Sequence, residues 1–165
     1  MTYARPVFFC RPADGEAPQI EMLAVPQPFT IVIGDTGVAS LTALAVGELR
    51  RLWQADPQPY ERLFDQAGEL ASFARRLIEA GRPLELGSLM DANHAVLQGM
   101  GVSSPELDRL VQAARRAGAL GAKLSGGGRG GNMIALAHPE QAPGVAAALT
   151  AAGATRVIIT EVEQV

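Results

Sequence analysis

The residues whose types and spacing suggest chemistry lie between positions 121 and 136, in the run GAKLSGGGRGGNMIAL. Five glycines and an asparagine fall within residues 126–132, so the backbone there can turn sharply and direct several N–H groups to one point. Lys123 is the only lysine of the chain, and Ser125 adds a hydroxyl group next to the glycines. This combination of backbone donors, one cation and one hydroxyl group is suited to binding phosphate.

Other glycine-rich motifs fit this segment less well. Residues 126–131 match the G-x-G-x-x-G pattern of dinucleotide-binding folds, but that pattern requires a helix directly after the glycines. Here the apolar run 133–137 is stopped by His138-Pro139, which is typical of a buried strand. A Walker A loop is excluded because no Gly-Lys-Ser/Thr sequence closes the run. Two interpretations stay open: a phosphate-binding loop, and a glycine-rich hairpin turn without a ligand.

Length and composition indicate a globular protein with one core. The chain has 165 residues, 48% of them hydrophobic and 19% charged, and its net charge of −3 argues against nucleic-acid binding. Cys10 is the only cysteine, which excludes an internal disulfide and fits a reducing compartment. With only two histidines in addition, we expect no structural zinc site. No signal peptide and no apolar run of about 18 residues is present, so we expect a cytoplasmic protein without a membrane segment.

The pattern of apolar residues and turn signals predicts the elements that position the glycines. They are strands at 5–10 and 19–25 that form a hairpin, a central strand at 29–33, helices at about 41–52, 63–77, 86–97 and 105–117, a strand pair flanking the glycines, a helix from 143 to 152 and a strand at 155–162. This order predicts an α+β fold. We expect a ferredoxin-like split βαβ sandwich with extra helices in the first crossover and an N-terminal hairpin.

Polar residues at two other places could line a site. Asp35 and Thr36 follow the central strand, where they could orient a ligand. Alternatively they only shape the turn and cap the next helix, a role that Ser40 could also fill. Asn93 and His94 interrupt the apolar stripe of the third helix, so they either tie neighbouring backbone together or face a cleft.

Segment 123–131 resembles the third, C-terminal motif of the GHMP small-molecule kinases. Segments 31–40, 89–94 and 118–123 are similar, in the same order, to those of the mevalonate kinases of this family, especially the archaeal and bacterial forms. Within this resemblance Arg129 stands in place of a small residue and Asn132 in place of a frequent cysteine. These departures predict a loop that is more cationic and more crowded than usual.

The resemblance implies a GHMP kinase C-terminal domain at 26–165 and a hairpin at 1–25 that belongs to a missing N-terminal domain. That domain holds the family's Pro-x-x-x-Gly-Leu-x-Ser-Ser-Ala loop for ATP and its catalytic aspartate, so we expect the chain to have no catalytic residue and to be inactive alone. The resemblance also implies ATP and Mg²⁺ as cofactors of the complete kinase and mevalonate as the acceptor. Homoserine, galactose and phosphomevalonate kinases and diphosphomevalonate decarboxylase remain alternatives.

By the same resemblance, one group of residues lines the phosphate and substrate side: Lys123, Ser125, Gly126, Gly127, Gly128, Arg129, Gly130 and Gly131. Asp35, Thr36, Asn93 and His94 are weaker substrate-side candidates. The expected partners are a small-molecule substrate, the missing N-terminal kinase domain and, through the hairpin, a second copy of the chain. A non-catalytic domain that binds a metabolite or a partner protein is the alternative function.

Overall fold

A computed structural model of the chain describes residues 6–11, 17–39 and 42–163. Parts of the predicted hairpin (1–5 and 12–16) and the alternative cap Ser40 therefore lie outside the described residues. The strands are β1 (Val7–Cys10), β2 (Gln19–Met22), β3 (Phe29–Asp35), β4 (Gly121–Ser125), β5 (Asn132–Ala137) and β6 (Arg156–Val162). The helices are α1 (Thr42–Ala55), α2 (Pro57–Glu79), the short 3-10 turn η1 (Pro83–Glu85), α3 (Leu86–Gly99), α4 (Pro105–Arg116) and α5 (Ala142–Ala151).

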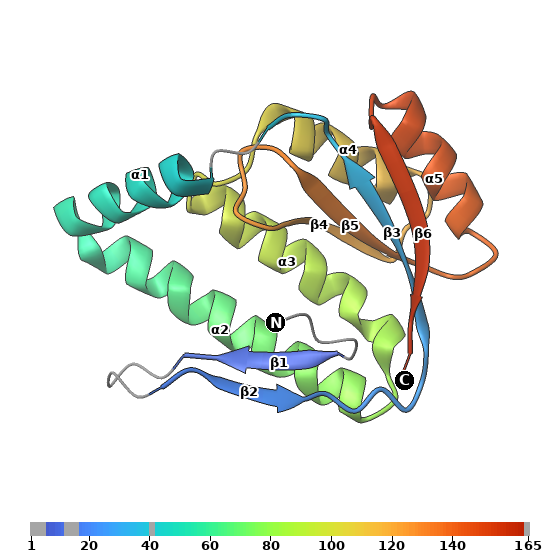
Figure 1. Ribbon diagram of the computed structural model, residues 1–165, viewed down its shortest axis with the longest axis horizontal. Coiled ribbons are helices and arrows are strands. Elements are labelled where there is room, and N and C mark those ends of the chain that lie inside the picture. Colours follow the sequence, from blue (N-terminus) through green and yellow to red (C-terminus); the bar gives the residue numbers. More distant parts are fainter. Residues whose placement is uncertain (1–5, 12–16, 40–41, 164–165) are drawn as a thin grey trace.

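Four strands form one sheet in the order β4-β5-β3-β6, and every neighbouring pair is antiparallel. The register places Ile33 of β3 opposite Ile134 of β5 on one side and Ile158 of β6 on the other. Helices α4 and α5 cover one face of this sheet (Figure 1). The predicted ferredoxin-like split βαβ arrangement is therefore confirmed, with α1 to α4 between β3 and β4.

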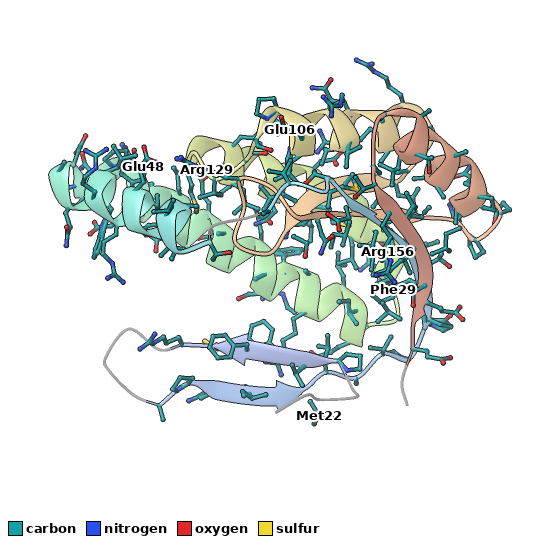
Figure 2. The ribbon with its side chains drawn as sticks, turned by 45° about the horizontal axis from the view of Figure 1, so that its top comes forward. Met22, Phe29, Glu48, Glu106, Arg129 and Arg156 are labelled. Carbon is teal, nitrogen blue, oxygen red and sulfur yellow. The ribbon has the colours of Figure 1, made fainter. Side chains whose placement is uncertain are left out.

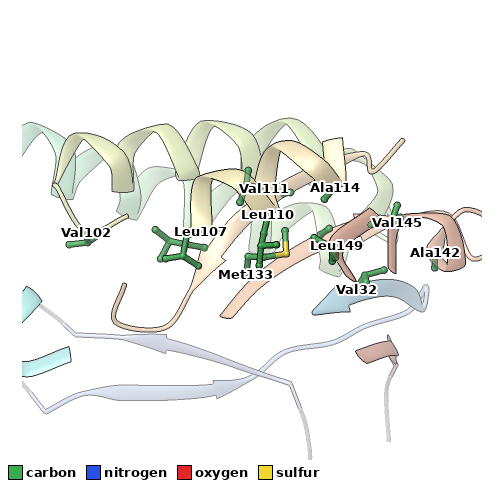
Figure 3. Packing of buried hydrophobic residues seen from close by; sticks show 14 of the residues in the cluster. Val32, Val102, Leu107, Leu110, Val111, Ala114, Met133, Ala142, Val145 and Leu149 are labelled. Carbon is green, nitrogen blue, oxygen red and sulfur yellow. The ribbon is translucent and has the colours of Figure 1, made fainter. Parts of the chain in front are cut away.

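The core lies between this face and α4. Leu107, Leu110, Val111 and Ala114 have almost no solvent-exposed surface and repeat at the spacing of one helical stripe, and they pack with Met133 and other sheet residues (Figure 3). Each fully buried leucine contributes roughly 1.5–3 kcal/mol through removal of its apolar surface from water. The helix begins as predicted, because the Ser104 hydroxyl accepts a hydrogen bond from the Leu107 N–H group at 3.3 Å.

Helix α3 runs along the outer edge of β4, and two glycines allow a very close approach. Gly87 of α3 and Gly121 of β4 face each other, so a Cβ atom on Gly121 would overlap with the carbonyl group of Gly87. The backbones of helix and strand thus touch directly. This contact fixes how far α3 stands from the sheet.

The hairpin of β1 and β2 forms a separate two-stranded sheet that lies on α2 (Figure 1). Arg75 of α2 holds it, with Nη2 2.6 Å from Glu21 Oε2 and its guanidinium group 4.7 Å from the centre of the Phe8 ring. The side chain of Phe9 is 59% exposed, and Ile20 and Met22 are also exposed. That this hairpin belongs to an N-terminal domain stays a prediction. Within the described ranges, no helix is both long and apolar enough to cross a membrane.

Substituting Gly121→Ala is expected to lower the free energy of unfolding by about 1–3 kcal/mol, because the new methyl group must push α3 away from β4. Gly47→Ala is the matched control. Gly47 lies within α1, and a methyl group added there would meet no heavy atom within 4 Å, so alanine should stabilise the helix by about 0.5–1 kcal/mol. Urea unfolding of both variants measures the difference, and equal effects would contradict the tight contact.

Candidate functional site

The strand that leads into the glycines is an edge strand whose outer N–H groups are paired with side chains of α3. The carboxylate oxygen Asp91 Oδ1 accepts a hydrogen bond from the Ala122 N–H group at 2.8 Å, and His94 Nδ1 accepts one from Leu124 N–H at 3.3 Å. Asp91 and His94 are neighbours on one helix face, and Ala122 and Leu124 point their N–H groups to the same side of the strand. The helix therefore replaces the missing neighbouring strand.

Arg115 of α4 completes this edge. Its Nε lies 2.7 Å from Asp91 Oδ1, and its Nη2 donates a hydrogen bond to the Ala122 carbonyl oxygen at 2.9 Å. The guanidinium group thus joins α4, α3 and β4. A bond between charged groups of this kind is stronger than one between neutral groups.

His94 is buried, with 2% of its surface exposed, and faces α4 rather than an open cleft. Its Nε2 lies 3.1 Å from Asp108 Oδ1, without good hydrogen-bond geometry, and the Ser103 hydroxyl donates to the same oxygen at 2.5 Å. Burial lowers the pKa of His94, and this effect outweighs the opposite influence of Asp108. The arrangement matches the interpretation that this imidazole ties neighbouring backbone together.

Two glycines of the loop pack tightly against other segments of the chain. A Cβ atom on Gly127 would overlap with the Thr42 side chain at the start of α1, and one on Gly128 would overlap with the Val102 carbonyl oxygen. Gly128 also has a φ of 81°, which favours glycine. Close packing therefore explains glycine at these positions, whereas a Cβ on Gly126 would meet nothing within 4 Å.

Some N–H groups of the loop are hydrogen-bonded to other segments of the protein. Arg129 N–H donates to the Val102 carbonyl oxygen at 2.6 Å, and Gly131 N–H to that of Val38 at 3.1 Å. For the N–H groups of Gly126 and Gly127, the structure records no acceptor within the ranges that it describes. These two groups follow Ser125 directly, so an anion could contact all three donors.

Arg129 adopts a positive φ of 55° and ties the loop to α1. Its Nη1 lies 2.7 Å from Glu48 Oε2, and its Nε donates to the Gly101 carbonyl oxygen at 3.0 Å (Figure 2). The side chains of Arg129 and Glu48 are 42% and 43% exposed, so this ion pair stabilises by about 1 kcal/mol or less. Glu48 also offsets part of the positive charge that the sequence predicts for the loop.

Asp35 and Thr36 meet the other end of the loop. The Thr36 hydroxyl group donates to the Gly131 carbonyl oxygen at 2.9 Å, and the Thr36 N–H group donates to the same oxygen. Asp35 Oδ1 accepts a hydrogen bond from Gly37 N–H at 2.9 Å, which shapes the turn. Both residues therefore fix the exit of the loop against β3.

Lys123 and Asn93 point to a different place from the glycines. They line a cavity of about 300 Å³ between α2, α3 and the sheet face that α4 and α5 leave uncovered. Lys123 faces this cavity because side chains alternate along β4, where Ala122 and Leu124 point into the core. Burial lowers the pKa of the Lys123 amine.

Sequence reasoning missed Glu48, Asp91, Asp108 and Arg115. Only Asp91 had a signal, because it precedes His94 by one helical turn on the same face. The other three pair with residues of other helices, strands or loops. Their partners cannot be read from local spacing.

Known proteins that are similar to this chain point to the GHMP kinases. A model of the family "GHMP kinases C terminal" matches residues 74–155. The mevalonate kinase of Pyrococcus abyssi is 40% identical over 150 residues, which are 88% of this chain and 43% of that protein. That of Thermococcus gammatolerans is 42% identical over 147 residues, or 84% of this chain and 43% of that protein. The chain thus spans less than half the length of these relatives.

Solved structures agree with the sequence matches. The Leishmania major mevalonate kinase in complex with R-mevalonate is similar with a TM-score of 0.88 and 33% identity, covering 96% of this chain and 49% of that one. The mevalonate kinase of methicillin-resistant Staphylococcus aureus has a TM-score of 0.67 and 26% identity, covering 87% of this chain and 45% of that one. Both matches cover most of this chain and less than half of the known one.

Acidification is expected to destabilise the protein through His94. Its pKa in the folded state lies below the ordinary value of 6.5, so the unfolded state binds more protons and the free energy of unfolding falls as the pH decreases below 6.5. One such group contributes at most about 1.4 kcal/mol per pH unit. His94→Gln keeps an acceptor for Leu124 N–H but does not titrate. Urea unfolding between pH 8 and pH 5 should give a smaller pH slope for this variant, and identical slopes would refute the assignment.

Proposed function

The chain belongs to the C-terminal domain family of the GHMP kinases, and from this premise we propose that it is the C-terminal half of a mevalonate kinase. Such an enzyme transfers the γ-phosphoryl group of ATP to the hydroxyl group of mevalonate. The observation that carries the proposal is the match of sequence and fold to mevalonate kinases along almost the whole chain. The acceptor and the activity belong to the complete kinase.

We assign phosphate binding to the start of the glycine-rich loop. The hydroxyl group of Ser125 and the N–H groups of Gly126 and Gly127 are adjacent donors, and Arg129 adds a cation a few residues further on. Phosphoryl transfer depends mainly on positioning and on stabilisation of negative charge, so fixed donors of this kind suit the reaction. Gly128, Gly130 and Gly131 support these donors by keeping the loop in shape.

The remaining candidates act at greater distance from the phosphate. Lys123 lies two residues before Ser125 on the same face of β4, so its charge adds to the positive potential at this face. Asp35, Thr36 and His94 hold the two ends of the loop in place. Asn93 belongs to the cavity that Lys123 lines.

ATP is the phosphoryl donor that membership of the family implies, and we propose Mg²⁺ as its companion in the complete kinase. The donors before and within the loop fit an anionic phosphate group. The part of the chain that the structure describes has no group of three or more His, Cys, Asp or Glu side chains that could hold a metal ion. These residues do not fit Mg²⁺, and we assign none of them to it.

We further propose that the partner of this half is an N-terminal kinase domain, to which the segment 1–25 belongs. The relatives are more than twice as long as the matched segment. The exposed apolar side chains of Phe9, Ile20 and Met22 support a covering partner on the hairpin. Residues 26–165 then form the domain that carries the glycine-rich loop.

The purified chain is expected to show no ATP-dependent phosphorylation of mevalonate, whereas its fusion to the N-terminal half of the Pyrococcus abyssi mevalonate kinase is expected to be active. The fusion restores the parts that the family keeps in its N-terminal domain. A coupled assay of ADP release measures both proteins. Activity of the fusion toward galactose or homoserine but not mevalonate would contradict the proposed acceptor.

Within the active fusion, Ser125→Ala is expected to reduce kcat/KM about tenfold or more, because one donor to the phosphate is lost. Ser88→Ala is the matched control, since Ser88 is an exposed serine on α3 away from the loop. An equal, small effect of both substitutions would argue against phosphate binding at Ser125.

A further inference from the structure

The cavity between the sheet and helices α2 and α3 has properties that the glycine-rich loop does not explain. Its walls come from Ile31 and Ile134 of the sheet, Leu70 and Ile78 of α2, and Leu89 of α3, together with other apolar side chains. Among the described residues that line it, only Lys123 and Asn93 are polar. A pocket with apolar walls and a few convergent polar groups is the usual form of a small-molecule site.

Lys123 brings a positive charge to this cavity without a negative partner. None of the described residues that line the cavity carries a carboxylate, and the ion pairs found in this part of the chain join other side chains. Lys123 is half-buried, and burial is the one cause that lowers the pKa of its amine. An anion that enters the cavity would offset this cost.

We propose that the cavity binds a small aliphatic monocarboxylate, with its carboxylate at Lys123 and Asn93 and its hydrocarbon chain against Ile31, Ile134 and Leu89. One ammonium group and one amide group match the charge and the hydrogen-bonding capacity of a single carboxylate. A diphosphate carries more negative charge than one ammonium group and one amide group can neutralise. The cavity volume of about 300 Å³ is at the lower end of the range for ligand pockets. The ligand must therefore be small.

This inference goes beyond the proposed kinase function. It concerns the cavity rather than the loop, and it requires neither ATP nor a second domain. Mevalonate carries hydroxyl groups that the apolar walls leave without partners, so the cavity favours a plain hydrocarbon chain.

Calorimetry on the purified chain tests the proposal with three probes. The carboxylate 4-methylpentanoate is expected to bind, whereas 4-methyl-1-pentanol, which has the same carbon skeleton without the charge, and acetate, which lacks the apolar body, should bind about tenfold more weakly or worse. Mevalonate should also bind more weakly than 4-methylpentanoate. Equal binding of the alcohol and the carboxylate, or no binding of 4-methylpentanoate, would overturn the proposal.

Two substitutions locate the site. Lys123→Met keeps an unbranched side chain without the charge and is expected to weaken 4-methylpentanoate binding about tenfold or more, to the level of the alcohol, whose own binding should not change. Ala74→Phe fills the cavity from α2 and should abolish binding of both probes. Unfolding curves confirm that each variant is folded. Carboxylate binding that survives Lys123→Met, or pyrophosphate that displaces 4-methylpentanoate, would refute the assignment.

The two proposals fail in distinguishable ways. An active fusion kinase together with no 4-methylpentanoate binding by the chain would remove only the cavity ligand. Binding that depends on Lys123, combined with an inactive fusion, would remove only the kinase assignment.

Discussion

The arrangement depends on how the outer edge of β4 satisfies its backbone hydrogen bonds. An edge strand normally exposes N–H and C=O groups, and here Asp91 and His94 of α3 and Arg115 of α4 pair with them. The short side chains of Asp91 and His94 reach the strand because Gly87 and Gly121 let α3 come into backbone contact with it. Since the glycine-rich loop starts directly after β4, the same contacts set where the loop begins. The start of the loop is therefore positioned by α3, and two glycines allow this helix to lie so close to the strand.

The loop satisfies two requirements with one run of glycines. Glycine at positions 127 and 128 is needed for close packing against Thr42 and Val102, and this packing holds the backbone in one shape. Within the described ranges, no protein acceptor is recorded for the N–H groups of Gly126 and Gly127. A fixed loop loses little further entropy when a phosphate binds, which favours affinity. Packing and ligand binding are thus complementary explanations of the glycine content.

Much of the fold followed from the sequence, because amphipathic periods and caps are local signals. The stripe of α4, its Ser104 cap and the strand after the glycines were predicted and are present. The surroundings of the Lys123 side chain were only partly predictable. The alternation of side chains along β4 places Lys123 on the face opposite the core, but it does not predict that α2 and α3 enclose a cavity there. Glu48 could not be found, because it meets Arg129 across 81 residues. Pairing of distant charges is decided by the packing of whole elements.

The two edges of the sheet differ in how their backbone groups are paired. Beyond β6 no further strand pairs within the described residues, so this seven-residue edge strand presents unpaired backbone groups beside the exposed side chains of Ile158 and Ile159. An open edge strand with exposed β-branched side chains is a template for intermolecular strand pairing. Arg156 and Glu161, at opposite ends of the strand, place charges that oppose such stacking. The edge at β4 is thus closed by helices and shapes the site, while at the open edge the charges near the two ends of β6 oppose strand pairing with another molecule.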